Sequence, residues 1–432
     1  MERARAVRAT VATVLLGVVF AGSATLVPAA NATASPAPSP SSSTGISSAT
    51  VNARITAKLI QRVRSPRLGK DFSVRIFDPQ TRSTIYSRQS LVGQVPASNL
   101  KLATAVIALK TLGPASTSTT RVIATTDPAT IVIVGGGDPL LTYARINLLA
   151  KRTADVLKAS PEPMTSVRVK FDNSRFAPFV SPRGWLSTYV PNQVNPVDAL
   201  SIYGRTTSSP ARFATKYFVQ RLVAAGVPAT YAGQATGAAG THVTKVVGAP
   251  LQTAVNRMLL VSDNNIAETL ARNSAIAIGQ PATWAGVRAS AQAQLAAMGV
   301  PMAGVSIIDG SGVSRANRLS AKALVTILRV ATSGNPAFAG VQSALPIAGR
   351  TGTLKASNKR YTTRPSKCAA GKVFAKTGSL TGVLSLSGIA MAADGKPRLF
   401  SIVLNKVSTK NYTRLQIRRS MDVLATTIVG CY

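Results

Sequence analysis

The stretch PASNLKLATAVIAL, residues 96–109, shapes the interpretation of the whole chain. From Lys101 onward it consists of good helix formers with one apolar stripe, and Pro96 lies where a helix begins. Ser98 and Lys101 are three residues apart, so a helix places them on one face. A helix N-terminus and a dry pocket favour a neutral lysine, which can accept the serine proton. The alternative is an ordinary N-cap serine with a surface lysine, although the sequence contains no other Ser-x-x-Lys.

The first 32 residues have the pattern of a secretory signal peptide. Three arginines precede a hydrophobic run over residues 11–27, and Ala30-Asn31-Ala32 fits an A-x-A cleavage site. We therefore predict that residues 1–32 are removed and that the mature chain is exported. An uncleaved membrane anchor is the alternative, although the run is slightly short for a membrane span.

The remaining chain begins with a linker and is strongly basic. Residues 33–50 are rich in Pro and Ser and cannot build a core. Without residues 1–32 the chain has 47 basic and 13 acidic residues, a net charge of +34. In an exported protein this charge favours anionic cell-wall polymers or an anionic membrane surface over nucleic acid.

Scarcity of histidine and cysteine excludes several catalytic chemistries. His242, the single histidine, lies among small residues in a predicted loop and outside any G-x-S-x-G context. No metal site is predicted, because a catalytic zinc usually needs several histidines. No cofactor is predicted either, since the glycines at 135–137 lack phosphate-binding spacing. Cys368 and Cys431 are expected to pair, closing a loop worth about 4 kcal/mol in the chain-entropy model.

Strand-like and helical patterns alternate along the chain, which predicts an α+β fold. Residues 72–77 and 83–86 predict a β-hairpin directly before the Ser98 helix. The pattern then changes, and we interpret residues 115–245 as a separate α+β insertion. Within it we expect strands at 121–124, 130–134 and 166–171 and a helix at 146–159.

Two further motifs follow the insertion. Residues 251–279 are strongly helical but are interrupted by Ser262-Asp263-Asn264-Asn265, a Ser-x-Asn element in an inter-helix turn. The alternative is a plain helix start, with Asn265 as N-cap and Glu268 completing a capping box. Lys376-Thr377-Gly378-Ser379 opens an extended run, 373–389, which is followed by a strand at 398–405 and a helix at 412–429.

These three motifs, in this order and in these contexts, resemble the penicillin-recognising serine transferases, which are the penicillin-binding proteins and serine β-lactamases. The 164 residues from Ser98 to Ser262 resemble the class C low-molecular-mass penicillin-binding proteins, D-Ala-D-Ala carboxypeptidases and endopeptidases with a long insertion. The resemblance implies a transpeptidase-like domain, an antiparallel sheet flanked by helices, formed by residues 51–114 and 246–432 and interrupted by 115–245. One departure is Thr351, where the family usually has Asp, which questions the contacts of that loop.

The resemblance also implies a role for each motif residue. Ser98 is the nucleophile, Lys101 its base, and Ser262 relays the proton to the leaving amine. The substrate is bound by the remaining motif residues, with Gly378 leaving room for it along the strand: Asn264, Lys376, Thr377, Gly378 and Ser379. The expected substrates are peptidoglycan stem peptides, and β-lactam antibiotics acylate Ser98 in the same way.

Two other functions remain open at this point. A serine β-lactamase of class A needs a glutamate-activated water, but neither Glu162 nor Glu268 lies in the expected Glu-x-x-Leu-Asn setting. A non-catalytic cell-wall-binding protein on the same fold is the second alternative. Loss of a residue from any of the three motifs would favour this non-catalytic alternative, and all three motifs are intact.

Overall fold

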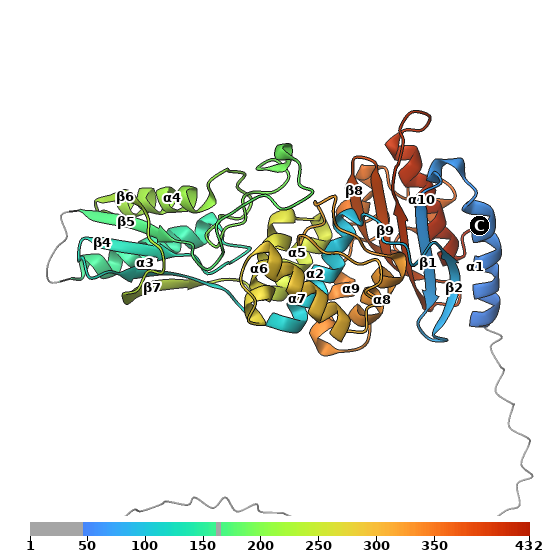
Figure 1. Ribbon diagram of the computed structural model, residues 1–432, viewed down its shortest axis with the longest axis horizontal. Coiled ribbons are helices and arrows are strands. Elements are labelled where there is room, and N and C mark those ends of the chain that lie inside the picture. The colour runs from blue at the N-terminus through green and yellow to red at the C-terminus, as the bar shows by residue number, and fades with distance from the viewer. Residues whose placement is uncertain (1–45, 161–165) are drawn as a thin grey trace, which may run out of the picture. The chain divides into compact units, whose positions relative to one another are not determined.

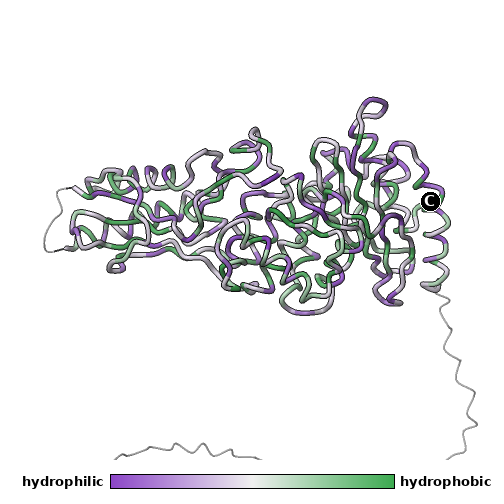
Figure 2. Tube along the Cα trace, viewed as in Figure 1, coloured by the Kyte–Doolittle hydropathy of each residue, from purple (hydrophilic) through white to green (hydrophobic). Residues whose placement is uncertain are grey.

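The computed structural model describes residues 46–160 and 166–432, so the predicted signal peptide lies outside the described residues. Helix α1 (Ser48–Arg62) begins inside the segment assigned to the linker. Its N-cap is Ser47, whose hydroxyl accepts the Thr50 N–H. The buried side chains of α1 follow helical spacing, and hydrophobic and hydrophilic residues alternate along its turns (Figure 2). Residues 48–50 are therefore helical rather than part of a linker.

The first sheet is antiparallel, with strand order β2-β1-β10-β9-β8. The predicted hairpin is confirmed as β1 (Phe72–Asp78) and β2 (Ser83–Arg88). The predicted extended run is divided by a turn into β8 (Val373–Leu380) and β9 (Val383–Met391), and β10 (Pro397–Leu404) returns between β9 and β1. Helices α1 and α10 (Arg414–Val429) cover one face, and α8 (Ala321–Ala331) packs on β1 and β10 from the other (Figure 1).

A group of helices packs beside this sheet, with α2 (Lys101–Leu112) at its centre. Every residue of α2 from 101 to 109 is buried, because α5, α6, α7 and α8 all contact it. A 3-10 turn, Ala97–Leu100, precedes α2 and contacts β8 and β9. The other helices of the group are α5 (Leu251–Val261), α6 (Asn264–Ala277), α7 (Trp284–Ala297) and the short α9 (Val341–Ala344).

The second sheet has strand order β6-β5-β4-β3-β7, and its core is separate from the other two large cores. Strands β4, β5 and β6 are parallel, and β3 joins β4 and β7 in antiparallel pairs. Helices α3 and α4 pack on each other and against this sheet. Bounds are β3 Thr119–Ala124, β4 Thr130–Val134, α3 Tyr143–Lys158, β5 Val167–Asp172, α4 Pro210–Ala224, β6 Ala229–Gln234 and β7 Thr241–Val247.

The α+β fold class is thus confirmed. Two details differ from the expectation. β7 extends two residues beyond position 245, and His242 is an exposed residue of β7 rather than of a loop. No described helix combines the length and hydrophobicity of a membrane span.

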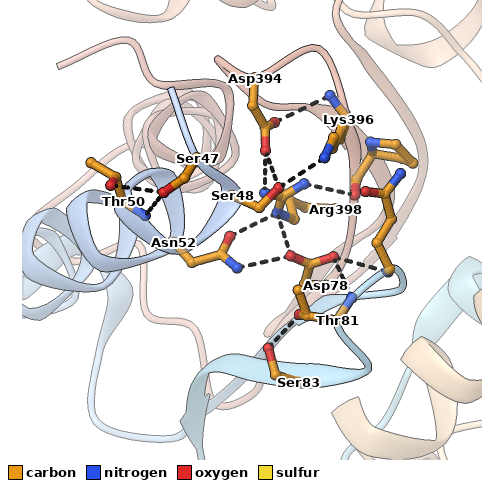
Figure 3. Close-up of polar contacts among 12 residues, drawn as sticks. Ser47, Ser48, Thr50, Asn52, Asp78, Thr81, Ser83, Asp394, Lys396 and Arg398 are labelled. Carbon is orange, nitrogen blue, oxygen red and sulfur yellow. Dashed lines mark hydrogen bonds and ion pairs between the residues drawn. The ribbon is translucent and has the colours of Figure 1, made fainter. Parts of the chain in front are cut away.

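Two connections tie the helices α1 and α10 to neighbouring parts of the fold: a disulfide joins the segment after α10 to the 3-10 turn Ser366–Ala369, and a charged cluster joins α1 to the first sheet. Cys368 and Cys431 form the expected disulfide, with Cα atoms 6.4 Å apart. On the other side, Figure 3 shows Arg398 of β10 among Asn52 of α1, Asp78 of β1 and Asp394. Its guanidinium donates to Asn52 Oδ1 at 2.8 Å and to Asp394 Oδ2 at 2.8 Å, and lies 3.5 Å from Asp78 Oδ2.

Candidate active site

A cleft of about 610 Å³ lies where the 3-10 turn before α2, the α5–α6 junction and β8 meet. Six of the eight predicted site residues line it: Ser98, Ser262, Asn264, Thr377, Gly378 and Ser379. The other two, Lys101 and Lys376, are completely buried and bond to these residues. The structure therefore brings all three motifs together, although they are far apart in the sequence.

Lys101 lies beneath Ser98, as the spacing predicts. Its Nζ is 3.1 Å from Ser98 Oγ, 2.7 Å from Asn264 Oδ1 and 2.7 Å from the Ser311 carbonyl. Burial lowers the pKa of Lys101 to about 8, against the opposing effect of negative charges led by Glu268. A neutral Lys101 keeps two N–H donors for the amide and carbonyl oxygens, which leaves its lone pair for the Ser98 hydroxyl.

The α5–α6 junction holds the Ser-x-Asn motif. Ser262 ends α5 with a left-handed backbone (φ 66°), and α6 begins at once. The N-cap is Asp263, whose carboxylate accepts the Ile266 N–H, so the alternative capping box on Asn265 and Glu268 is wrong. Asn264 donates its Nδ2 to the Gln193 carbonyl at 2.7 Å, which directs its Oδ1 to Lys101.

Lys376 connects the second and third motifs. From the buried side of β8 its Nζ donates to Ser262 Oγ at 2.8 Å and to the Thr377 carbonyl at 2.7 Å. Burial, followed by the positive charge of Lys101, holds the pKa of Lys376 well below its usual value. Each of the two serines, Ser98 and Ser262, therefore has beside it a buried lysine of lowered pKa.

The end of β8 forms the cleft wall, and one detail corrects the expectation. A Cβ on Gly378 would lie 2.1 Å from Ser385 Oγ and 2.8 Å from the Pro96 carbonyl. The missing side chain thus lets β8 approach the turn that carries Ser98, and the space it leaves is filled by protein rather than by substrate. Thr377 donates its hydroxyl to Thr353 Oγ1 at 2.8 Å.

The wall is positively charged. Ser379 Oγ accepts from Arg414 and, at 3.2 Å, from Arg418, and Lys359 and Arg418 also line the cleft, together with Arg360, which is paired with Asp422. No Asp or Glu is among its lining residues. The neighbouring Thr351 makes a local contact in place of the family's Asp, because its hydroxyl accepts the Ile347 N–H at 2.9 Å.

Sequence reasoning assigned no role in the site to the residues behind Lys101, which are Glu268 and Asp309. Glu268 is completely buried and its carboxylate accepts the N–H groups of Gly310 and Ser311, both at 2.8 Å. Asp309, also buried, accepts from Gly312, Ser314, Asn317 and Trp185. The available signal was a glutamate on the apolar side of α6, but the capping-box pattern offered a local explanation for it.

Chemically, the site offers a serine hydroxyl next to a lysine of lowered pKa, a second serine bonded to a second lysine, and a cationic wall. This suits acyl transfer to serine, with proton movement through amines. The described part of the chain contains no cluster of three or more His, Cys, Asp or Glu side chains able to hold a metal ion.

The sequence matches the D-Ala-D-Ala carboxypeptidase 3 (S13) family over residues 55–202 and 186–428. The chain belongs to this family. It is therefore a serine-type D-Ala-D-Ala carboxypeptidase, as the motifs predicted.

Two relatives support this membership, and one solved structure shares the fold. A carboxypeptidase of Mycobacterium tuberculosis is 31% identical over 88% of this chain and 84% of its own length. The carboxypeptidase DacB of Mycolicibacterium smegmatis is 31% identical over 87% and 84%. The crystal structure of penicillin binding protein 4 from Haemophilus influenzae shares the fold of this S13 chain, with a TM-score of 0.73 at 18% identity over 87% of this chain and 98% of that one.

Proposed function

We propose that this S13 enzyme trims peptidoglycan stem peptides as a D-Ala-D-Ala carboxypeptidase, an endopeptidase or both, through an acyl-serine intermediate formed on Ser98. The observation that carries the proposal is the contact of Lys101 Nζ with Ser98 Oγ, with the other two polar partners of Lys101 being oxygens that can only accept. These partners orient a neutral amine toward the hydroxyl proton.

In the proposed acylation, Lys101 takes the Ser98 proton as Oγ attacks the carbonyl between the last two D-alanines. The backbone N–H groups of Ser98 and Ser379 stabilise the oxyanion. Collapse of the tetrahedral intermediate breaks the C–N bond, and the leaving amine receives a proton from Ser262, which Lys101 and Lys376 replenish. Water then attacks the acyl-serine by the same route in reverse, which releases the shortened peptide and free Ser98.

Substrate binding is assigned to the cleft wall. Thr377 and Ser379 receive the terminal carboxylate of the peptide, with Lys376 buried behind them and bonded to Ser262, and Arg418 adds positive charge beside Ser379. Asn264 binds the peptide backbone or side chain while it holds Lys101. Gly378 contributes by letting β8 approach Ser98 closely. Penicillin occupies the same places, because its lactam carbonyl and carboxylate mimic the dipeptide.

We also propose that the enzyme acts outside the cytoplasm and contacts anionic polymers of the cell wall or an anionic membrane surface, but not nucleic acid. The predicted signal peptide and the net charge of +34 without residues 1–32 support this location and these partners. A surface groove of about 390 Å³ offers one place for such contacts. Its lining includes four arginines and no acidic residue: Arg62, Arg67, Arg364 and Arg419.

For the domain organisation, we propose one catalytic unit in two pieces, residues 51–114 and 246–432, with residues 115–245 inserted. The order of strands in the two sheets supports this division, because β1, β2, β8, β9 and β10 form the first sheet and β3 to β7 form the second.

Intact-mass spectrometry after incubation with benzylpenicillin tests the proposal, with Ser98→Ala as the matched variant. We expect one stable penicillin adduct on the wild type, none on the variant, and release of D-Ala from a pentapeptide by the wild type alone. Release of an intact tetrapeptide from cross-linked dimers would add the endopeptidase activity. Penicillin consumed without an adduct would instead indicate a β-lactamase, and penicillin left intact would indicate a non-catalytic wall-binding protein.

A further inference from the structure

We propose that Glu268 is a positioning residue for Lys101: it fixes the backbone loop whose carbonyl holds the lysine, and it supplies a buried negative charge that tunes the lysine's basicity. The inference rests on the proposed function, because it concerns the base that activates Ser98. It adds a residue outside the three motifs to the acylation machinery.

The position of Glu268 on α6 makes this coupling possible. It lies four residues after Asn264, so both side chains project from the same face of the helix. Asn264 contacts Lys101 directly. Glu268, one turn further into the core, uses its two oxygens separately: Oε2 accepts the Gly310 N–H and Oε1 accepts the Ser311 N–H, each at 2.8 Å.

The loop that Glu268 holds is bound on its other side to α2. The Ser311 carbonyl accepts from Lys101 Nζ at 2.7 Å, and the Gly310 carbonyl accepts from Thr104 Oγ1 at 2.5 Å. The path from Glu268 to Lys101 therefore passes through a single residue, Ser311, whose N–H meets the carboxylate and whose carbonyl meets the amine.

Close packing leaves this loop no room to shift. A Cβ on Gly310 would lie 2.6 Å from the Ala267 carbonyl oxygen of α6. A Cβ on Gly312 would lie 2.0 Å from the carbonyl oxygen of Ala97, the residue before Ser98. A Cβ cannot lie this close to a backbone oxygen, so both positions require glycine. The loop therefore packs tightly between α6, which carries Glu268, and the turn that carries Ser98.

The electrostatic surroundings of Lys101 give Glu268 a second effect. The charged groups around the lysine are Lys376 from β8, Asp263 and Glu268 at the start of α6, and Asp309 from the loop, with Arg272 beyond Glu268. Burial lowers the pKa of Lys101, and Glu268 leads the charges that oppose this effect. Burial and the charge of Asp309 in turn raise the pKa of Glu268 to about 7, against its hydrogen bonds to Gly310 and Ser311, so its negative charge is fully present above neutral pH.

No other side chain reproduces both effects. Gln keeps the length but offers one acceptor oxygen, so one buried N–H would lose its partner and the negative charge would disappear. Asp keeps the charge but is one methylene shorter than the bidentate geometry requires. The two variants therefore separate the charge from the positioning.

The test measures the acylation rate with a chromogenic cephalosporin from pH 5.5 to 10 for the full-length wild type and for Glu268→Gln, Glu268→Asp and Asp78→Asn. Asp78 is the matched control, since it is also a buried carboxylate that accepts two backbone N–H groups, but it lies beside α1. Thermal unfolding of each variant reports folding.

For Glu268→Gln we expect the plateau rate to fall about 10-fold or more, because the base is misplaced. The rising part of its pH–rate profile, here called the acid limb, should also move to lower pH by about one unit, because loss of the neighbouring negative charge lowers the pKa of Lys101. Glu268→Asp should lower the plateau with the limb near that of the wild type, and Asp78→Asn should change neither.

If the acid limb and the plateau rate of Glu268→Gln coincide with those of the wild type, the inference is overturned. An equally large shift of the acid limb in Asp78→Asn would overturn it as well. If Glu268→Gln does not fold, a wild-type plateau in Glu268→Asp is the overturning result. A wild type that is never acylated would refute the proposed function itself, and the inference with it.

Discussion

Two clusters of buried charged side chains in the described part of the chain, one around Arg398 and one around Lys101 and Lys376, differ in whether the charges are paired. Arg398 lies between Asp394, at 2.8 Å, and Asp78, at 3.5 Å. By contrast, within the described residues neither Lys101 nor Lys376 has a carboxylate oxygen within 4 Å, and both donate to hydroxyl, amide or carbonyl oxygens.

The difference shows how one fold uses burial in two ways. Burial alone would raise the pKa of Asp78, but hydrogen bonds led by that of Asn52, and the charge of Arg398, hold it below its usual value. In the other cluster burial prevails, so the pKa values of both lysines fall. Paired charges connect α1 to the sheet, whereas the two unpaired lysines lose protons more readily than a lysine in water does.

Among the substitutions that test this contrast, Lys101→Met should have the largest effect, and that effect should be on the acylation rate. The substitution keeps an unbranched side chain in the core but removes the base, so we expect the acylation rate to fall about 10²- to 10⁴-fold. Stopped-flow kinetics with a chromogenic cephalosporin measures the rate, and circular dichroism confirms that the variant is folded. A folded variant that reacts within tenfold of the wild-type rate would remove Lys101 from the mechanism.

Arg398→Met tests the paired cluster. It leaves Asp78 and Asp394 buried without their cation, so the free energy of unfolding should fall by about 3–5 kcal/mol. Chemical denaturation gives this value. The folded fraction should acylate at the wild-type rate, because the pair lies outside the cleft lining. A loss below 1 kcal/mol, or a slowed acylation, would contradict the division of roles.

The pH dependence of acylation sharpens the contrast. The base is active when neutral, and burial lowers the pKa of Lys101 to about 8. The rate should therefore rise about tenfold per pH unit below pH 8 and level off above it. A rate that is flat between pH 6 and 9 would argue for a lysine that is already neutral throughout, or for another base.

Asn52→Ala should have the smallest effect. It removes one hydrogen bond to Asp78 and one from Arg398 but leaves the ion pairs in place. Because Asn52 is only half-buried, water can replace part of the loss, and we expect unfolding to become easier by about 1–2 kcal/mol. A loss equal to that of Arg398→Met would show that Asn52, rather than the charges, holds the cluster together.

Local patterns predicted the parts of the site that local geometry determines. Ser98 and Lys101 are one helical turn apart, so their contact follows from spacing alone. The contact of Lys376 with Ser262 joins residues 114 positions apart, and only the family resemblance anticipated it. The roles of the motif residues remain predictions until the variants are measured.

The expectations that were wrong share a physical cause. For Glu268, a local capping pattern competed with a tertiary contact to the Gly310–Ser311 loop, and the tertiary contact prevailed. For Gly378, the neighbour that requires a glycine is Pro96, which is distant in sequence. Helix α1 escaped prediction in part because its start lies within a Ser-rich segment, where Ser47 serves as its cap.

The pairing of β1 with β10 has a consequence for biogenesis. Phe72 of β1 lies opposite Leu404 of β10. β1 is synthesised early, but it can pair with β10 only after almost the whole polypeptide has been made. The second sheet, built from β3 to β7, can be completed while the first is still a lone hairpin. A product of synthesis that ends before residue 373 therefore lacks β8 and Lys376, and Ser262 is left without its lysine partner.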